Sequence, residues 1–373
     1  MENNQWYALH EVSAIATPTL LVYSQRVQEN ITKLLAMAGG DTSRLRPHIK
    51  TCKSPDAIKA MMQAGLSKFK CATIAEAELL GICGATDVLI AYQPVGANIK
   101  RLIQLIKQYP ETAYACLVDN FSLAQDLEQV AIKNRLTIKV YIDVNVGMNR
   151  TGIAPDYLWE LLIGCSSLTH LALIGIHCYD GHIHDHSLDD RRAKCEAYFL
   201  PILSITEKYA KDYGQELTIV IGGTPTFPIH IERSEKNIEC SPGTFVYWDY
   251  GYQNLCAEQP FLTAALVLSR VISLPSKNKI CVDLGHKAVA AENELAKRVL
   301  FLNAPEAKPV AQSEEHLVLD VGQNHSYQVG DFLYGLPYHI CPTVALYEEA
   351  LEVIDHQARG LWKIPARKRK INI

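Results

Sequence analysis

The feature of this chain that most constrains its fold is a regular alternation of short β-branched apolar runs with longer stretches of helical period, which begins after Thr17-Pro18. Such an alternation is typical of βαβ units and of a parallel sheet. The eight candidate strands are residues 44–50, 68–73, 88–92, 113–118, 138–143, 173–178, 217–221 and 238–240. This number of strands predicts an α/β fold of the (β/α)8, TIM-barrel type.

Capping residues mark several of the helices between these strands. Ser54-Pro55-Asp56 places a proline in the first turn of a helix that runs to Gly65, and glycine is common just past a helix end. Asn120-Phe121-Ser122 begins another helix, in which apolar residues recur at helical spacing. A long helix is predicted from Asp189 to Tyr213.

The pattern changes at about Phe261, where strands separated by turns replace the alternation. The clearest strand-like runs are 261–275, 279–285, 316–322 and 351–364, with little helix between them. A chain of 373 residues is long enough for two domains of about 150 residues each. We therefore predict a barrel domain over 18–258 and a separate β-rich domain over 259–373.

The charge balance and the hydropathy pattern exclude several classes of protein. The chain has 36 basic and 40 acidic residues, which leaves no basic surplus for a nucleic-acid backbone. The first 17 residues lack the basic start and apolar run of a secretory signal, and no apolar run reaches the roughly 20 residues of a membrane span. The 11 cysteines include no CxxC pair, which is typical of reduced thiols. We expect a cytoplasmic protein with neither a nucleic-acid nor a membrane partner.

Polar residues gather where the predicted barrel strands end, and this is the edge at which such barrels carry their active sites. Lys50 ends the first strand, and Tyr179 and His182 follow the sixth. A lysine at this edge can have a lowered pKa and can form a Schiff base with an aldehyde cofactor. Lys50, Tyr179 and His182 are therefore candidate catalytic residues.

Glycines and threonines follow the seventh and eighth strands. Backbone N–H groups at glycines can approach an anion closely, and barrels of this kind often hold a phosphate at this position. Two adjacent glycines alone are also typical of a tight turn without a ligand. The candidate phosphate-binding residues are Gly222, Gly223, Thr224, Gly243 and Thr244.

A candidate metal pair lies in the predicted β-rich domain. His339 and Cys341 are two residues apart, so in an extended strand both side chains would point to one face and could bind one zinc ion. Two ligands do not complete a zinc site, and an ordinary strand can also carry both residues. The competing metal site consists of His177, His182, His184 and His186.

Eight runs, placed mainly at predicted strand ends, carry a resemblance to a known family. They are TPTLLVY (17–23), RPHIKTCKS (46–54), DVNVGMNRTG (143–152), HCYDGH (177–182), GGTPT (222–226), ECSPGTFVYWD (239–249), VDLGHKA (282–288) and VGDFLYGLPYHICPTV (329–344). In this order they resemble the D-serine dehydratase and D-threonine aldolase group of fold-type III, alanine-racemase-like pyridoxal-phosphate enzymes. The resemblance spans almost the whole chain.

The resemblance implies a barrel that binds pyridoxal 5'-phosphate, a β-domain to which residues 1–17 also contribute, and a homodimer. Lys50 then matches the Schiff-base lysine, Arg150 an arginine near the cofactor ring, and Tyr179 a tyrosine at the barrel rim. The glycine and threonine residues named above match the phosphate-binding stretches.

The resemblance also implies a divalent metal, zinc or another ion, on His339 and Cys341. The pair matches His-x-Cys of the dehydratase branch rather than His-x-Asp of the aldolase branch. Two residues depart from the family: Cys52 stands where histidine is frequent, and Ser241 stands where arginine is usual.

The predicted function is that of a pyridoxal-phosphate- and metal-dependent lyase acting on a small D-3-hydroxy amino acid. The leading reaction is dehydration of a D-serine-like substrate to a 2-oxo acid and ammonia. The first alternative is D-threonine aldolase activity, which gives glycine and an aldehyde. Amino-acid racemisation and non-catalytic binding of pyridoxal phosphate remain further alternatives.

Overall fold

The computed structural model describes residues 5–373, so residues 1–4 of the predicted segment 1–17 lie outside the described part. The chain divides into two compact units, which we name by their sheets. The β unit comprises 5–33, Thr51–Ala57 and Thr244–Arg367, and the barrel unit comprises Leu34–Lys50, Ile58–Gly243 and Lys368–Ile373. The domain boundaries 18–258 and 1–17 with 259–373 stay a prediction.

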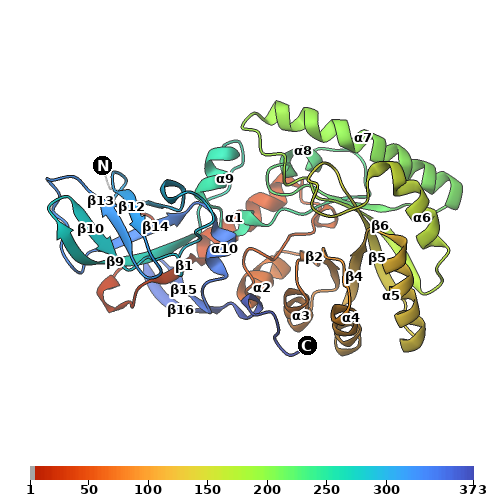
Figure 1. Ribbon diagram of the computed structural model, residues 1–373, viewed down its shortest axis with the longest axis horizontal. Coiled ribbons are helices and arrows are strands. Elements are labelled where there is room, and N and C mark those ends of the chain that lie inside the picture. The colour runs from red at the N-terminus through yellow and green to blue at the C-terminus, as the bar shows by residue number, and fades with distance from the viewer. Residues whose placement is uncertain (1–4) are drawn as a thin grey trace. The chain divides into compact units, whose positions relative to one another are not determined.

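The barrel unit is built on a parallel sheet whose strands follow one another in chain order. Its strands are β2 (Lys68–Cys71), β3 (Asp87–Ile90), β4 (Ala113–Val118), β5 (Ile138–Val144), β6 (Leu171–Cys178), β7 (Thr218–Ile221) and β8 (Ile238–Cys240). The helices that follow β2 to β7 are α3 (Ile74–Cys83), α4 (Ala97–Gln108), α5 (Phe121–Asn134), α6 (Leu158–Ser166), α7 (Leu188–Tyr213) and α8 (Phe227–Ile231). In Figure 1, α3 to α6 lie along the outside of this sheet. The predicted α/β barrel class is confirmed.

Residues 44–50 are not a regular strand, which corrects one of the eight predicted strands. A 3-10 turn ends at Arg44, and the segment then makes isolated parallel bridges from Leu45 to Cys240 in β8 and from His48 to Lys70 in β2. Pro47 interrupts a continuous ladder because it has no N–H to donate. The segment still occupies the eighth position of the barrel, between the last strand and the first.

The predicted helix starts are confirmed by their caps. The Asn120 side chain accepts a hydrogen bond from Leu123 N at 2.8 Å, which satisfies one of the free N–H groups at the start of α5. The predicted helix 54–65 is α2 (Pro55–Gln63), and Gly65 follows it with φ of +92°, a conformation that favours glycine. Of the residues that the structure describes, none lies in a helix long and apolar enough to cross a membrane.

A buried ion cluster joins three parts of the barrel unit. The Arg46 guanidinium lies 2.6 Å from Glu239 Oε2 in β8 and 2.6 Å from Asp87 Oδ1 in β3, while only 1% of the Arg46 side chain is exposed. Lys68 also pairs with Glu239, at 2.5 Å. The cluster ties the irregular segment 44–50 to strands on either side of it.

Replacing Arg46 by methionine is expected to lower the free energy of unfolding by about 3–5 kcal/mol, because Glu239 would then stay buried without its main partner. Urea titration followed by circular dichroism measures this change. The control is Lys208→Met, which removes an exposed helix pair with Asp212 and should change stability by less than about 1 kcal/mol. Equal effects of the two substitutions would contradict the proposed role of the buried cluster.

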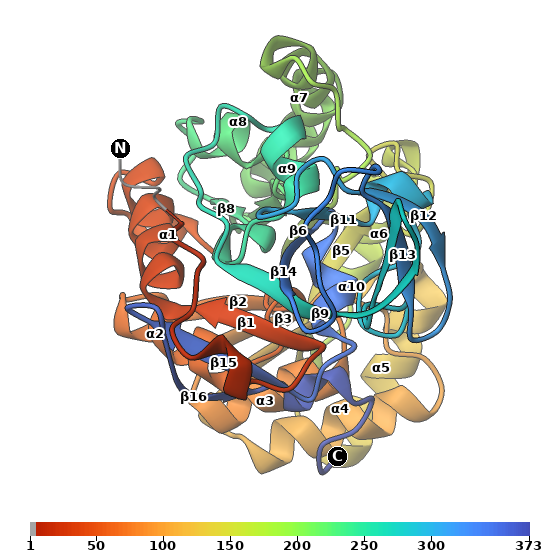
Figure 2. The ribbon, with the colours of Figure 1, turned by 90° about the vertical axis from the view of Figure 1, so that its left-hand side faces the viewer.

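The β unit contains a nine-stranded mixed sheet with the main order β12-β13-β10-β9-β1-β15-β16, while β14 pairs with β9 and β11. Its strands are β1 (Thr19–Tyr23), β9 (Ala265–Ser276), β10 (Lys279–Val282), β11 (Val299–Phe301), β12 (Lys308–Gln312), β13 (Leu317–Asp320), β14 (Phe332–Pro337), β15 (Glu349–Ile354) and β16 (Gln357–Lys363). The unit also contains the helices α9 (Tyr250–Leu255) and α10 (Ile340–Val344) and most of α1 (Ser24–Met37). Figure 2 shows β1 beside β15, its parallel partner.

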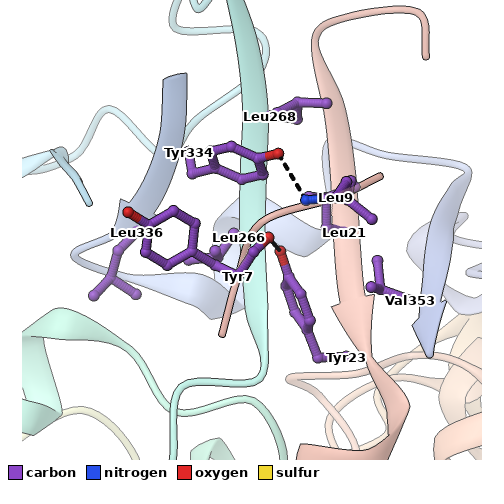
Figure 3. Close-up of a cluster of buried hydrophobic side chains, with 9 residues drawn as sticks. All are labelled: Tyr7, Leu9, Leu21, Tyr23, Leu266, Leu268, Tyr334, Leu336 and Val353. Carbon is purple, nitrogen blue, oxygen red and sulfur yellow. Dashed lines mark hydrogen bonds between the residues drawn. The ribbon is translucent and has the colours of Figure 1, made fainter. Parts of the chain in front are cut away.

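The N-terminal strand belongs to this sheet because its apolar run is buried there. Leu21 and Tyr23 of β1 pack with Leu266 and Leu268 of β9 in a cluster that also contains Tyr334. Two hydrogen bonds lie within this cluster, from Leu9 N to Tyr334 Oη at 3.0 Å and from Tyr23 Oη to Tyr7 O at 2.6 Å (Figure 3). Residues from both ends of the chain therefore share one core.

Candidate active site

Three cationic side chains of the barrel unit surround one aromatic ring. Lys50 Nζ lies 5.4 Å, Lys70 Nζ 5.8 Å and the Arg150 Cζ atom 4.7 Å from the centre of the half-buried Tyr179 ring. Lys50 ends the irregular segment between β8 and β2, Arg150 lies in the loop after β5, and Tyr179 follows β6. The structure thus brings together three residues that the sequence analysis had proposed separately, and it adds Lys70. Such a group favours an anionic ligand.

Lys70 belongs to a hydrogen-bonded chain across the barrel. Its Nζ lies 3.5 Å from His177 Nε2, and His177 Nδ1 lies 2.8 Å from Asp143 Oδ1. The other oxygen of Asp143 accepts a hydrogen bond from Gln93. Burial, and then the positive charge of Lys50, lowers the pKa of Lys70 to about 7. Burial and the nearby Lys70 also lower the pKa of His177, so the imidazole is neutral and its Nδ1 proton points to Asp143.

The two glycine-containing stretches lie side by side after β7 and β8. Ser241 N donates to the carbonyl oxygens of Ile221 and Gly222 at 3.0 Å, and Gly243 N lies 3.4 Å from Thr224 Oγ1. Gly222 has φ of +72°, and a Cβ there would lie 3.4 Å from Cys240 Sγ. Thr244 begins the next 3-10 turn and belongs to the β unit. The predicted phosphate stretches are therefore adjacent at Gly222, Thr224 and Gly243.

These stretches fit a phosphate-bearing aldehyde cofactor in two respects. Ser241 is 3% exposed, yet its Oγ has no hydrogen-bond partner among residues 5–373. A buried hydroxyl normally has a partner, so an absent polar group is indicated at this place. The nearby cations of the Tyr179 group would balance a phosphate, and the Lys50 amine can react with an aldehyde.

Asp180 holds the turn at Gly223 through a hydrogen bond. Its Oδ1 accepts a hydrogen bond from Gly223 N at 3.3 Å, and its Oδ2 lies 3.1 Å from His230 Nε2 and 2.8 Å from Tyr198 Oη. Burial alone would raise the pKa of Asp180, but hydrogen bonds led by that from His230 lower it to about 2. The carboxylate is therefore charged and holds the turn in place.

Asp180, Cys195 and His230 also form the one cluster in the described part of the chain that has three converging metal-ligand atoms. However, Arg233 Nε donates to His230 Nδ1 at 3.2 Å, so the His230 Nε2 carries the proton that Asp180 accepts. Neither imidazole nitrogen then has a free lone pair for a metal. The cluster serves the glycine turn.

The four histidines of the competing metal site are separated by the fold. His177 is buried on β6, whereas His184 and His186 are exposed. His182 lies against the loop after β5, since a Cβ on Gly147 would come within 2.8 Å of its Nε2. His182 Nδ1 is buried without a hydrogen-bond partner in the described structure.

The predicted metal pair lies in the β unit. His339 Nδ1 lies 2.6 Å from Glu292 Oε1, which leaves Nε2 as the nitrogen available to a metal. Burial would lower the pKa of His339, but the hydrogen bond to Cys341 and nearby negative charges raise it to about 9. This excess of negative charge favours a cation, and a nitrogen–sulfur donor pair fits zinc. The metal-binding prediction therefore has suitable donors.

The prediction that His339 and Cys341 lie in an extended strand is wrong. Residues 340–344 form the short helix α10 rather than an extended strand, and His339 is its N-cap residue. The two side chains converge because they stand at the start of this helix, whose first N–H, that of Ile340, donates to Asp249 Oδ2 at 3.0 Å. Cys341 Sγ also lies 3.1 Å from Thr51 Oγ1, and Thr51 directly follows Lys50 in the chain.

Lys70, Asp143 and Glu292 were missed as site residues in the sequence analysis. In KFKC, the sequence of β2, Lys68 and Lys70 alternate with apolar residues, which suggests an exposed face. Strands of a parallel barrel are covered on both faces, and so Lys70 is buried. A lysine at the centre of such a strand was the available signal, because lysine is seldom fully buried without a functional or structural partner.

Comparison with known proteins identifies the family of this chain. Residues 22–251, more than half of the chain, match the model of the alanine racemase N-terminal domain, and residues 264–353 match a putative serine dehydratase domain. The chain is 24% identical to D-threonine aldolase of Arthrobacter sp., over 95% of this chain and 94% of that protein. It is also 24% identical to D-serine dehydratase of Dictyostelium discoideum, over 93% and 94% of the two chains.

Solved structures share the fold. The structure of D-threo-3-hydroxyaspartate dehydratase from Delftia sp. HT23 matches with a TM-score of 0.82 at 22% identity, covering 94% of this chain and 98% of that one. A mutant of that dehydratase is described in a metal-free form. The chain belongs to the alanine racemase N-terminal domain family, the fold-type III group of pyridoxal-phosphate proteins, and its C-terminal part resembles the putative serine dehydratase domain.

Proposed function

We propose that this protein is a pyridoxal-phosphate- and metal-dependent lyase that dehydrates a D-3-hydroxy amino acid such as D-serine to a 2-oxo acid and ammonia. The observation that carries the proposal is the position of the Lys50 amine beside Arg150 and Tyr179 in the barrel unit. The relatives named as a D-serine dehydratase and a D-threonine aldolase support the substrate class.

Lys50 would hold the cofactor through its amine, while Gly222, Gly223, Thr224, Gly243 and Thr244 would bind its phosphate. When bound, pyridoxal phosphate delocalises the negative charge that remains on Cα after a proton leaves. Arg150, packed against Tyr179, would add positive charge beside the cofactor. These residues hold and orient the ligand.

Lys50 would also act as the base. Once its amine is free, it would take the α-proton of the substrate, and this role needs only a small movement of a flexible side chain. The ring of Tyr179 lies beside Lys50 and would orient its amine. His182 is proposed to act at the same mouth, because its buried Nδ1 is available to a bound group.

His339 Nε2 and Cys341 Sγ would hold a zinc ion. A zinc ion there would polarise the substrate hydroxyl, which is otherwise a poor leaving group. Thr51, whose hydroxyl contacts Cys341, is the residue that follows Lys50 in the chain. In the overall reaction, the α-proton and the β-hydroxyl leave as water, and hydrolysis then releases the 2-oxo acid and ammonia.

Retro-aldol cleavage of a D-threonine-like substrate is the second candidate function, and the relative from Arthrobacter favours it. In that reaction the Cα–Cβ bond breaks, and a base takes the proton of the hydroxyl. Cys341, where the aldolase branch has aspartate, favours dehydration instead.

Product analysis separates the two functions. The purified protein, loaded with zinc and cofactor, is incubated with D-serine and D-threonine in parallel, with and without a chelator. Pyruvate or 2-oxobutyrate together with ammonia, lost on chelation, supports the metal-assisted dehydratase. Glycine and acetaldehyde from D-threonine would assign the aldolase reaction instead.

Glu292 offers a test of the metal pair that leaves both proposed ligands in place. Because Glu292 orients His339 through Nδ1, Glu292→Gln should weaken zinc binding by about 10- to 100-fold. Competition with a chromophoric chelator measures the affinity. Glu294→Gln, which removes an exposed carboxylate paired with Lys297, is the control. An unchanged zinc affinity in the Glu292 variant would remove this residue from the site.

We also propose that the enzyme works as a homodimer in the cytoplasm. All 11 cysteines are free thiols, which suits a reducing compartment. The dimer rests on the resemblance to the family, and light scattering of the purified protein tests it. A monomer with full activity would contradict it.

A further inference from the structure

Lys70 is a buried amine with no carboxylate in direct contact among the described residues. Only 3% of its surface is exposed. In the part of the chain that the structure describes, its one assigned hydrogen-bond partner is the neutral nitrogen His177 Nε2, at 3.5 Å. An ammonium group taken out of water needs an anionic partner or loses its proton. An anionic group bound beside Lys70 would therefore stabilise the protonated form of its amine.

The direction of the Lys70 amine is determined by its neighbours. Asp143 accepts the proton of His177 Nδ1 at 2.8 Å, which leaves Nε2 as an acceptor for one N–H of Lys70. Asp143 is in turn held by Gln93, whose Nε2 also donates to Asp119 at 2.9 Å. A lysine has two further N–H donors, and Lys70 Nζ lies 5.8 Å from the Tyr179 ring beside which Lys50 also lies.

We propose that Lys70 is a further cationic contact for the oxyanion of the ligand bound at Tyr179, and that His177 and Asp143 position it. This inference rests on the proposed function, because it takes the group at Tyr179 as the ligand site. The oxyanion belongs either to pyridoxal phosphate or to the carboxylate of the amino-acid substrate. Lys70 would thus be a ligand-contacting residue, distinct from Lys50, which holds the cofactor covalently.

A purely structural role explains the arrangement less well. A lysine used to stabilise a barrel interior would pair with a carboxylate, as Arg46 does with Glu239 in the same unit. Lys70 instead faces Lys50, whose charge disfavours the protonated amine, while Asp143 and Asp180 act on it only from a distance. A ligand oxyanion would relieve this repulsion.

The test compares Lys70→Met, which keeps the length of the side chain and removes its charge, with Lys70→Arg, which keeps the charge. Lys139→Met, a change of an exposed lysine on β5, is the matched control. The first measurement is the dissociation constant of pyridoxal phosphate for the apoprotein, from quenching of tryptophan fluorescence. The second is KM and kcat of the loaded enzyme with D-serine.

Lys70→Met should raise one of these binding constants by about 10- to 100-fold, the usual effect of a lost hydrogen bond to a charged group, whereas the control should stay within about 2-fold. A raised dissociation constant assigns the contact to the cofactor. A raised KM with unchanged cofactor affinity assigns it to the substrate carboxylate. Lys70→Arg should recover most of the loss in either case.

His177→Asn keeps Lys70 and removes its acceptor, so a smaller rise in the same constant is expected. This variant also serves if Lys70→Met does not fold, as judged from circular dichroism. Wild-type affinity and KM in Lys70→Met, or in His177→Asn where the methionine variant is unfolded, would overturn the inference. Failure of the wild-type protein to bind pyridoxal phosphate at all would instead overturn the proposed function.

Discussion

Lys50→Ala is expected to lower kcat/KM for D-serine by at least about 1,000-fold, because the substitution removes the residue that holds the cofactor and the base that takes the α-proton. The absorbance band of the lysine-bound cofactor should disappear at the same time. Both effects follow from one amine, located 5.4 Å from the centre of the Tyr179 ring. A continuous assay for the 2-oxo acid and an absorbance spectrum measure them.

The control for this substitution is Lys59→Ala, which removes an exposed lysine on α2. Its spectrum and activity should match those of the wild type. If the band persisted in Lys50→Ala, another amine would hold the cofactor, and Lys70 would be the first to examine, because it also lies beside the Tyr179 ring.

Removal of the metal ligands is the second large effect. His339→Ala and Cys341→Ala should each lower dehydratase activity by more than about 100-fold, since loss of a mere outer partner of a metal ligand already costs about 10- to 100-fold. Bound zinc, measured by atomic absorption, should fall together with activity. Cofactor binding should remain, because neither residue is among those proposed to hold the cofactor.

His316→Ala, a change of an exposed histidine in the β unit, is the matched control and should keep both zinc and activity. Full activity of the two ligand variants after treatment with a chelator would show that the reaction needs no metal at this pair. The proposed function would then be reduced to a metal-independent pyridoxal-phosphate reaction.

The barrel could be predicted from the sequence because most of its strands are largely apolar and buried, and because α3, α5 and α7 each begin at a side-chain cap. Asn120, for example, caps α5 by accepting a hydrogen bond from Leu123 N, only three residues further along the chain. Residues 44–50 were the exception. Their place in the alternation suggests a strand, but Pro47 removes a donor, and isolated bridges together with the ion pairs of Arg46 hold the segment instead.

Only part of the candidate site could be predicted from the sequence. Lys50, Arg150 and Tyr179 follow predicted strands or lie in the loops after them, so their common edge follows from the barrel type. Lys70 escaped prediction because alternation in a short strand does not say whether the opposite face meets solvent or a barrel interior. His339 and Cys341 were paired by spacing, yet it is the helix start at His339, anchored by Asp249 from far away in the chain, that brings them together.

The sequence by itself determined the order of strands and helices, the residue types at the strand ends and the donor types of the metal pair, because these depend on local spacing and chemistry. Only the tertiary structure decided which charges meet. Lys70 faces His177 and Asp143 across strands that are more than 70 residues apart, and Glu292 reaches His339 across 47 residues. Such contacts arise from packing between distant segments, and no local pattern encodes them.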